Sequence, residues 1–243
     1  MSETNQFLRA SIAAPVADIL RRLPRMGTVM VNTRHGGATH ERMGLVEDVV
    51  VTDESVLCRG ACHDARIAPE RISTVVVDRT GRMQDKVLPR LDFLGDGRAV
   101  VFSVIGLAGL EPFDAGLAGL VESGLHGPVE KGHRETPVLA EDDPGLPPLK
   151  AAAHNEEPVI IEIARPGFFQ RWRGIVGSVK PAMGFINVMH ADFHLHLRGG
   201  AVGGWQRGTA DGEALLEALG ADGMPTGLRL RGSAAVFRAV QAR

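Results

Sequence analysis

Short segments rich in β-branched residues, separated by glycine and aspartate, recur through most of this 243-residue chain. Valine, isoleucine and threonine pack well on a pleated surface, whereas glycine and aspartate favour the turns between strands. These segments predict an α+β protein in which large antiparallel β-sheets are flanked by a few helices. They lie at residues 28–32, 44–51, 72–78, 98–106, 158–164, 173–179, 185–198 and 228–232.

Two helices and a linker complete the predicted organisation. Residues 13–23 have an apolar helical face that ends at Pro24, and residues 112–123 form a second candidate helix. Proline, glycine and acidic residues crowd the middle of the chain, which is typical of a linker. We therefore expect a first domain at residues 1–125, a linker at residues 126–157 and a second domain at residues 158–243.

Similar strand and turn motifs recur in the two halves of the chain at a nearly constant offset. A duplicated unit keeps such spacing even when its side chains have diverged, so the pattern predicts two tandem β-rich repeats. Thr28-Val-Met-Val matches Pro158-Val-Ile-Ile, Gly44-Leu-Val matches Gly174-Ile-Val, and Asp64-Ala-Arg-Ile matches Asp192-Phe-His-Leu.

The charge balance disfavours two classes of partner. The formal net charge is −2, so the chain has no basic excess that would attract nucleic-acid phosphates or an anionic membrane surface. Its apolar runs are also shorter than the roughly 20 residues that cross a bilayer, and its first residues lack the apolar core of a signal peptide. The sequence predicts a protein that neither binds nucleic acid nor inserts into a membrane.

Cysteine usage points to a reducing compartment. Cys58 and Cys62 are the two cysteines of the chain, which is too few for a disulfide scaffold or a four-thiolate zinc site. We therefore expect a cytoplasmic protein, with both thiols acting as small apolar side chains. The sequence motifs of common hydrolases and nucleotide-binding proteins are absent.

One histidine-rich segment stands out for its chemistry. Alternate residues of a regular strand lie on the same face. The even-numbered positions of this segment include His190, His194, His196 and Arg198, which would therefore all lie on one face of one strand. Neutral imidazoles are common ligands of iron and other transition metals, which makes this face a candidate metal site. A solvated polar face of an antiparallel strand would have the same pattern, and both interpretations stay open. The other face, with Phe193, Leu195 and Leu197, should be buried.

A second histidine has a carboxylate beside it in the sequence. His40 and Glu41 could form a coordinating group oriented by an acid, but they follow an Arg-His-Gly-Gly turn. Residues next to such a turn are more often simply exposed to solvent. We therefore favour exposure for this pair.

Several motifs of the second half occur together in a known family. Residues 174–223 resemble the second repeat of the HemS/ChuS haem-utilisation family in order and spacing, and residues 23–48 and 63–77 resemble its first repeat, with His40-Glu41 in the family's His-Glu position. The matching motifs are Gly184-Phe-Ile-Asn, Asp192-Phe-His-Leu-His-Leu, Val202-Gly-Gly-Trp and Asp211-Gly. The resemblance also implies a strand at residues 212–220, although their composition favours a helix.

The resemblance implies haem as bound cargo and gives candidate contacts for it. Arg66 occupies the position of the family's haem-contacting arginine, and the repeat alignment makes His194 its equivalent in the second half. His194 and His196 are therefore the candidate iron ligands. Arg231 lies approximately where the family has a tyrosine, and it completes the candidate set.

Other family features are missing from this sequence. The family's N-terminal helical segment and the helix between the repeats, which has the ligand histidine, both lack counterparts here. His126, His133 and His154 lie in the shortened stretch, but none has the sequence context of the family ligand.

These observations predict a cytoplasmic haem-binding protein that carries haem to a degrading enzyme. Its partners would be haem itself, a haem oxygenase and the haem-uptake transporter. A degenerate paralogue without haem, acting as a structural or protein-interaction module, is the main alternative. A haem-degrading oxygenase comes third, because the sequence identifies no electron donor for ring opening.

Overall fold

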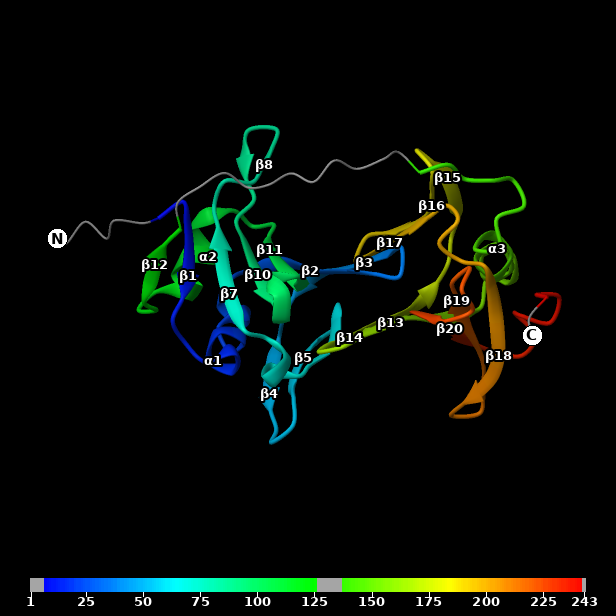
Figure 1. The fold of residues 1–243 in the computed structure, drawn as a ribbon, viewed down its shortest axis with the longest axis horizontal. Coiled ribbons are helices and arrows are strands. Elements are labelled where there is room, and N and C mark those ends of the chain that lie inside the picture. The colour runs from blue at the N-terminus through cyan, green and yellow to red at the C-terminus, as the bar shows by residue number, and fades with distance from the viewer. Residues whose placement is uncertain (1–6, 126–136, 242–243) are drawn as a thin grey trace. The chain divides into compact units, whose positions relative to one another are not determined.

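A computed structural model describes residues 7–125 and 137–241, which form two units (Figure 1). Of these residues, unit 1 contains 7–32, 43–125 and 166–168, and unit 2 contains 33–42, 137–165 and 169–241. The helices are α1 (Val16–Leu20), α2 (Leu110–Leu117) and α3 (Leu146–Asn155), with 3₁₀ turns at Leu23–Arg25, Pro69–Arg71 and Asp96–Arg98.

Strands make up most of the described secondary structure in both halves of the chain. The first half has β1 (Arg9–Ile12), β2 (Thr28–His35), β3 (Ala38–Leu45), β4 (Asp48–Val51), β5 (Val56–Gly60), β6 (His63–Ile67), β7 (Thr74–Asp78), β8 (Arg82–Met83), β9 (Lys86–Val87), β10 (Arg90–Leu94), β11 (Val100–Gly106) and β12 (Glu122–Gly124). The second half has β13 (Pro158–Arg165), β14 (Phe168–Ile175), β15 (Val179–Ala182), β16 (Phe185–His190), β17 (Phe193–Arg198), β18 (Gly204–Ala210), β19 (Glu213–Leu219) and β20 (Pro225–Gly232).

Unit 1 is built on antiparallel strands in the order β12-β1-β7-β10-β11-β2, together with the β4–β5–β6 meander. Alternate residues of these strands face an apolar core that includes Val77, Leu91 and Phe93. Helices α1 and α2 contribute Ile19 and Phe113 to the same core, so they cover apolar surface that the strands leave open.

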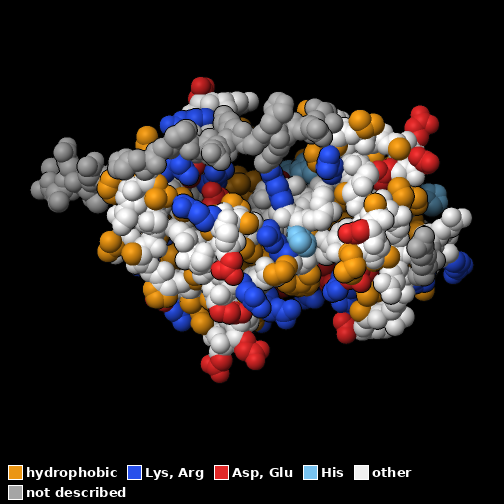
Figure 2. Space-filling view, in the orientation of Figure 1, with side chains coloured by type: hydrophobic (Ala, Val, Ile, Leu, Met, Phe, Trp, Pro, Cys, Tyr) orange, Lys and Arg blue, Asp and Glu red, His pale blue; other side chains and the backbone are white. Residues whose placement is uncertain are grey.

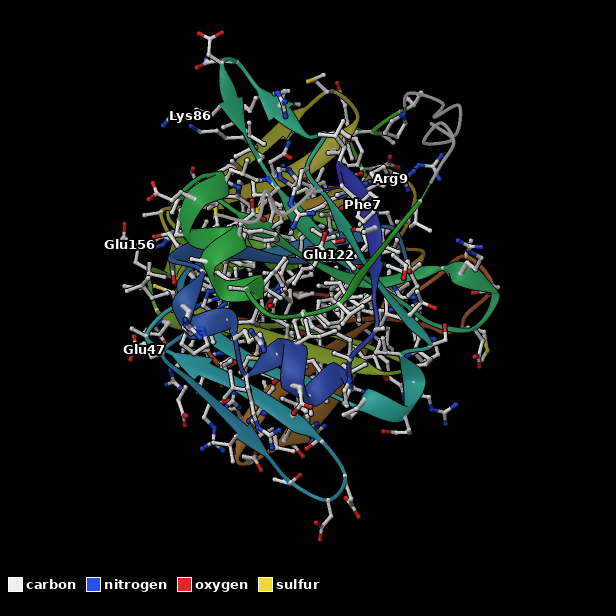
Figure 3. The ribbon with its side chains drawn as sticks, turned by 90° about the vertical axis from the view of Figure 1, so that its left-hand side faces the viewer. Phe7, Arg9, Glu47, Lys86, Glu122 and Glu156 are labelled. Carbon is white, nitrogen blue, oxygen red and sulfur yellow. The ribbon has the colours of Figure 1, made fainter. Side chains whose placement is uncertain are left out.

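A buried arginine ties three elements of unit 1 together. Arg79 pairs with Glu122 of β12 at 2.7 Å and with Asp114 of α2 at 2.8 Å, and it donates to the carbonyl of Phe7. Figure 3 shows Arg9 on β1 and Phe7 just before this strand, with Glu122 on the neighbouring strand β12. Burial of the guanidinium opposes its charge, but the two carboxylates outweigh this and hold the pKa of Arg79 above its usual value.

Unit 2 contains two sets of antiparallel strands, β3-β17-β16-β15 and β18-β19-β20-β13-β14. Both sets contribute side chains to one core, Leu195 of β17 and Ile161 of β13 among them. Trp172 packs in the same core, parallel to Phe193 at a ring-centroid distance of 4.6 Å. Helix α3 adds Leu149 to this core. The core therefore lies between two layers of strands, and each layer has a second, outward face.

The turn between β2 and β3 requires glycine at position 36. Gly36 has a φ of +53°, and a Cβ there would overlap the carbonyl oxygen of Thr226 in β20. The turn can lie against β20 only because residue 36 has no side chain.

The structure confirms the α+β class and refines several sequence expectations. The predicted helix at 13–23 is a shorter helix followed by a 3₁₀ turn, and the one at 112–123 is α2, which begins earlier and ends at Leu117. Residues 212–220 contain the strand β19, as the family resemblance implied. The tandem repeat and the domain boundaries stay predictions.

The segment expected as a linker contains α3, which the sequence concealed because prolines occupy its first turn. One expectation about the strands was wrong. The segment 185–198 is a hairpin, β16 and β17, instead of one strand. No helix in the described parts of the chain has the length and apolar character needed to span a membrane.

Buried and outward-facing side chains alternate along β17, which predicts different effects of substitution on the two faces. Leu195 is fully buried, so Leu195→Ala should lower the free energy of unfolding by about 2–5 kcal/mol, measured by guanidinium unfolding. Met189 lies on the opposite face of the same hairpin and is 48% exposed, so Met189→Ala should change that free energy by less than about 0.5 kcal/mol. Equal effects of the two substitutions would contradict this assignment of faces.

Candidate functional site

The candidate site lies on the outward face of β3, β17 and β16 in unit 2. In this antiparallel ladder, His194 is opposite both Glu41 of β3 and Met189 of β16. His196 is in turn opposite Thr39 of β3 and Asn187 of β16. Residues that are directly opposite share a face, so the ladder places the two imidazoles and the carboxylate together.

The three side chains converge on one carboxylate oxygen. Oε2 of Glu41 is 3.3 Å from Nδ1 of His194 and 3.8 Å from Nε2 of His196. The candidate ligand atoms of all three residues lie within 4.8 Å of one another. Glu41 is 13% exposed and the histidines 25% and 31%, so the carboxylate is the deepest member and the imidazoles remain accessible to solvent.

Asn187 fixes the orientation of His196. The amide nitrogen of Asn187 lies within hydrogen-bonding distance of the backbone carbonyls of Lys180, Ala182 and Phe185, so its Oδ1 points to Nδ1 of His196 at 2.6 Å. Because an amide oxygen only accepts, Nδ1 of His196 has the proton. In the neutral imidazole, Nε2 then has the lone pair that a metal ligand requires, whereas in the imidazolium form Nε2 has a proton that Glu41 can accept.

The electrostatics of the cluster favour an ionised Glu41. Burial alone would raise the pKa of its carboxyl group, but hydrogen bonding and charge from His196, and then from His194, outweigh burial. The pKa of Glu41 therefore lies below its usual value. A carboxylate, rather than a neutral acid, faces the two imidazoles at neutral pH.

Similar solved structures share this architecture. No protein-family model matches the sequence, and no curated protein matches it. The holo form of PhuS, a haem-binding protein from Pseudomonas aeruginosa, has a TM-score of 0.77 and 17% identity, over 97% of this chain and 87% of that one. ChuS, a haem oxygenase from Escherichia coli, has a TM-score of 0.76 and 17% identity, over 97% of this chain and 86% of that one. The chain has the ChuS and PhuS fold.

Within this ChuS-type fold, the other two candidate residues are on strands outside the β3–β17–β16 ladder. Arg66 is exposed on β6 in unit 1. Arg231 is on β20 in unit 2, paired with Asp211 at 2.8 Å, Glu213 at 3.1 Å and Glu162 at 3.5 Å.

The register of β20 separates Arg231 from the histidines. Its neighbour Leu230 enters the core of unit 2, so Arg231 faces outward from the β13–β20 layer. His194 faces outward from the β3–β17 layer, because Leu195 enters the same core from the other side. The structure therefore does not bring Arg231 and the histidines into one site.

His190 was wrongly grouped with the other histidines. The hairpin turn at residues 191–192 changes the parity, so His190 is opposite Phe193 on the core-facing side. It lies at the rim of the core, where it is 2.6 Å from Asp192 and its ring is 5.6 Å from that of Trp172. Asp192 also accepts from Trp172 and pairs with Arg42, which anchors the turn.

The expected exposure of the His40 and Glu41 pair was also wrong. His40 is fully buried on the core side of β3, where Nε2 donates to the carbonyl of Ile161 and Nδ1 accepts from the amide of Gln170. Burial is the main cause that lowers the pKa of His40 to about 3. This imidazole is neutral and structural in the folded protein.

Sequence reasoning also missed the roles of Glu41 and Asn187. Glu41 is 153 positions from His194, and Asn187 is nine positions from His196 across the hairpin turn. The pairing of β3 with β17 and of β16 with β17 brings them together. The family resemblance placed Glu41 in a named motif, but nothing in that motif indicated its partner.

Burial of His40 predicts a pH-dependent stability. Unfolded His40 titrates near 6.5 and folded His40 near 3, so unfolding takes up a proton between these values. The free energy of unfolding should therefore fall as pH drops below about 6.5, with His40 contributing up to about 1.4 kcal/mol per pH unit. In guanidinium unfolding from pH 7 to 5, His40→Gln should have a shallower slope than the wild type. Equal slopes in His40→Gln and the wild type would refute the prediction.

Proposed function

We propose that this protein binds haem reversibly and carries it in haem utilisation, in the cytoplasm. The fold supports this proposal: the similar structures are a haem-binding protein, PhuS, and a haem-degrading enzyme, ChuS, and each likeness extends over more than nine tenths of the chain. The single observation in this chain that carries the proposal is the accessible imidazole pair of His194 and His196.

The residues around this pair fit the requirements of haem. A porphyrin needs an axial nitrogen, apolar surface for its ring and cations for its propionates. Phe185 and Met189 supply apolar surface on the same face as the histidines, and the exposed Lys180 and Arg198 supply positive charge there. When bound, haem would supply an iron centre that takes an axial imidazole.

His194 is the preferred axial ligand in this proposal. If its Nδ1–H donates to Glu41, Nε2 keeps the lone pair, and the carboxylate makes the imidazole a stronger donor. His196 is the second candidate nitrogen. Arg66 would contact a propionate or an iron-bound water, as the family resemblance implies. Arg231 has no part in the proposal, because its guanidinium is already engaged by three carboxylates.

A carrier fits these residues better than an oxygenase does. Carriage needs only reversible ligation, for which partly exposed imidazoles suffice, whereas ring opening also needs electrons from a donor. The carrier's partners would be a haem-degrading enzyme that receives the haem and the uptake transporter that delivers it. Figure 2 shows acidic, basic and hydrophobic side chains intermixed on the drawn face.

We also infer that the two halves, 1–125 and 158–243, derive from one duplicated unit. Strand lengths support this inference, because β2 to β6 have 8, 8, 4, 5 and 5 residues and β13 to β17 have 8, 8, 4, 6 and 6. In this alignment β6, with Arg66, corresponds to β17, with His194.

A haemin titration followed by Soret absorption tests the proposed function. The wild type should give a saturable one-to-one shift, which His194→Ala should abolish and Arg66→Ala should weaken. His190→Ala is the matched control, because it removes an exposed histidine of the same hairpin from the other face, and it should bind haemin like the wild type.

Two other outcomes are informative. Loss of the shift in His196→Ala, with His194→Ala unaffected, would move the axial ligand to His196 and leave the carrier function intact. A weak, unsaturable change in the wild type would overturn the proposal, and the non-haem interaction module would replace it.

A further inference from the structure

We propose that Glu41, His194 and His196 form a site for a divalent transition-metal ion, bound directly through one carboxylate oxygen and two imidazole nitrogens. This inference goes beyond the proposed haem binding and does not depend on it. The ion would be a first-row metal such as Zn²⁺, Co²⁺ or Fe²⁺, because two nitrogen ligands and one oxygen ligand favour these over Mg²⁺ or Ca²⁺.

The spacing of the candidate ligand atoms supports direct coordination. Metal–ligand bonds of about 2.0–2.2 Å in a tetrahedral or octahedral site leave neighbouring ligand atoms about 3–3.5 Å apart. Oε2 of Glu41 is 3.3 Å from His194 Nδ1 and 3.8 Å from His196 Nε2, so the first pair already has this separation. The second pair needs a shift of a few tenths of an ångström. The two imidazole nitrogens lie within 4.8 Å of each other, so rotation of the histidine side chains would bring them to this separation.

The backbone holds the three ligands in place. Glu41 and His194 are directly opposite in the β3–β17 ladder, and His196 is the next residue on the same face of β17. Leu195, between the two histidines, is fully buried and anchors the strand to the core of unit 2. An ion would therefore bind a largely preformed triad, with little loss of conformational entropy.

A second set of contacts orients the ligands. Asn187 holds the proton of His196 on Nδ1 and leaves Nε2 ready to coordinate. Metal-bound histidines usually have such a partner for their other nitrogen. Solvent reaches both imidazoles, so an ion can enter and water can complete its coordination. Two histidines and one carboxylate with open positions are the ligand set of many zinc and non-haem iron sites.

The haem and metal-ion proposals use the same side chains in different ways. In haem binding, Glu41 accepts a hydrogen bond from His194 and is not itself an iron ligand. In metal-ion binding, the Glu41 carboxylate is itself a ligand and supplies negative charge. The substitution Glu41→Gln therefore removes a ligand in the metal-ion proposal only.

The test is a Co²⁺ titration of the metal-free full-length protein, followed by visible d–d absorption, with Zn²⁺ displacement measured by calorimetry. The wild type should bind one Co²⁺, and Zn²⁺ should displace it. Glu41→Gln, His194→Ala and His196→Ala should each weaken binding by more than about tenfold, and Asn187→Ala by about tenfold. His190→Ala should bind like the wild type, although it removes a histidine that is paired with an acid.

The remaining outcomes separate this inference from the haem proposal. A Glu41→Gln protein that keeps the wild-type unfolding midpoint but loses Co²⁺ would establish the ion site and exclude misfolding as the cause. Loss of haemin binding in the wild type, with Co²⁺ binding retained, would refute only the proposed function. Co²⁺ binding that is unchanged in Glu41→Gln, or that disappears in His190→Ala, would overturn the ion site.

Discussion

The pairing of β3 with β17 is the contact on which the chemistry of this chain depends. It joins residues more than 150 positions apart and sets which side chains face outward together. On one face it brings Glu41 to His194 and His196, and on the other it buries His40 beside Phe193. A slip of one residue in this register would bury the histidines and expose the leucines between them, so packing of the core fixes the composition of the site.

The sequence predicted what depends on local pattern. Strand composition gave the α+β class, and the alternation in 193–198 correctly assigned Phe193, Leu195 and Leu197 to the core. Prediction from the sequence failed where a turn, or a strand far away in the chain, determines which side chains lie together. The hairpin turn at Asp192 removes His190 from the histidine face, and prolines in its first turn concealed α3. The partnership with Glu41 comes from strand pairing over a long separation, which residue spacing along the chain does not contain.

The haem and metal-ion proposals give the Glu41 carboxylate two different roles. As a hydrogen-bond acceptor it strengthens an imidazole that faces a porphyrin, and as a ligand it neutralises part of the charge of a bare ion. The position of a single proton on His194 distinguishes the two states: on Nδ1 it favours an axial bond through Nε2, and on Nε2 it leaves Nδ1 free to join Glu41. Under these two proposals, one surface would bind ligands of very different size.

The division of the chain into units has a consequence for its synthesis. Residues 33–42, translated early, belong to unit 2, whose remaining strands leave the ribosome only after residue 157. Before β17 is synthesised, residues 38–42 of β3 lack the strand with which they pair, and they present an open strand edge. The nascent first half is thus an incomplete folding unit that exposes backbone hydrogen-bonding groups and is open to premature association with other chains. The rate of translation between β3 and β17, and the access of chaperones to the nascent chain during that interval, would influence the yield of native protein.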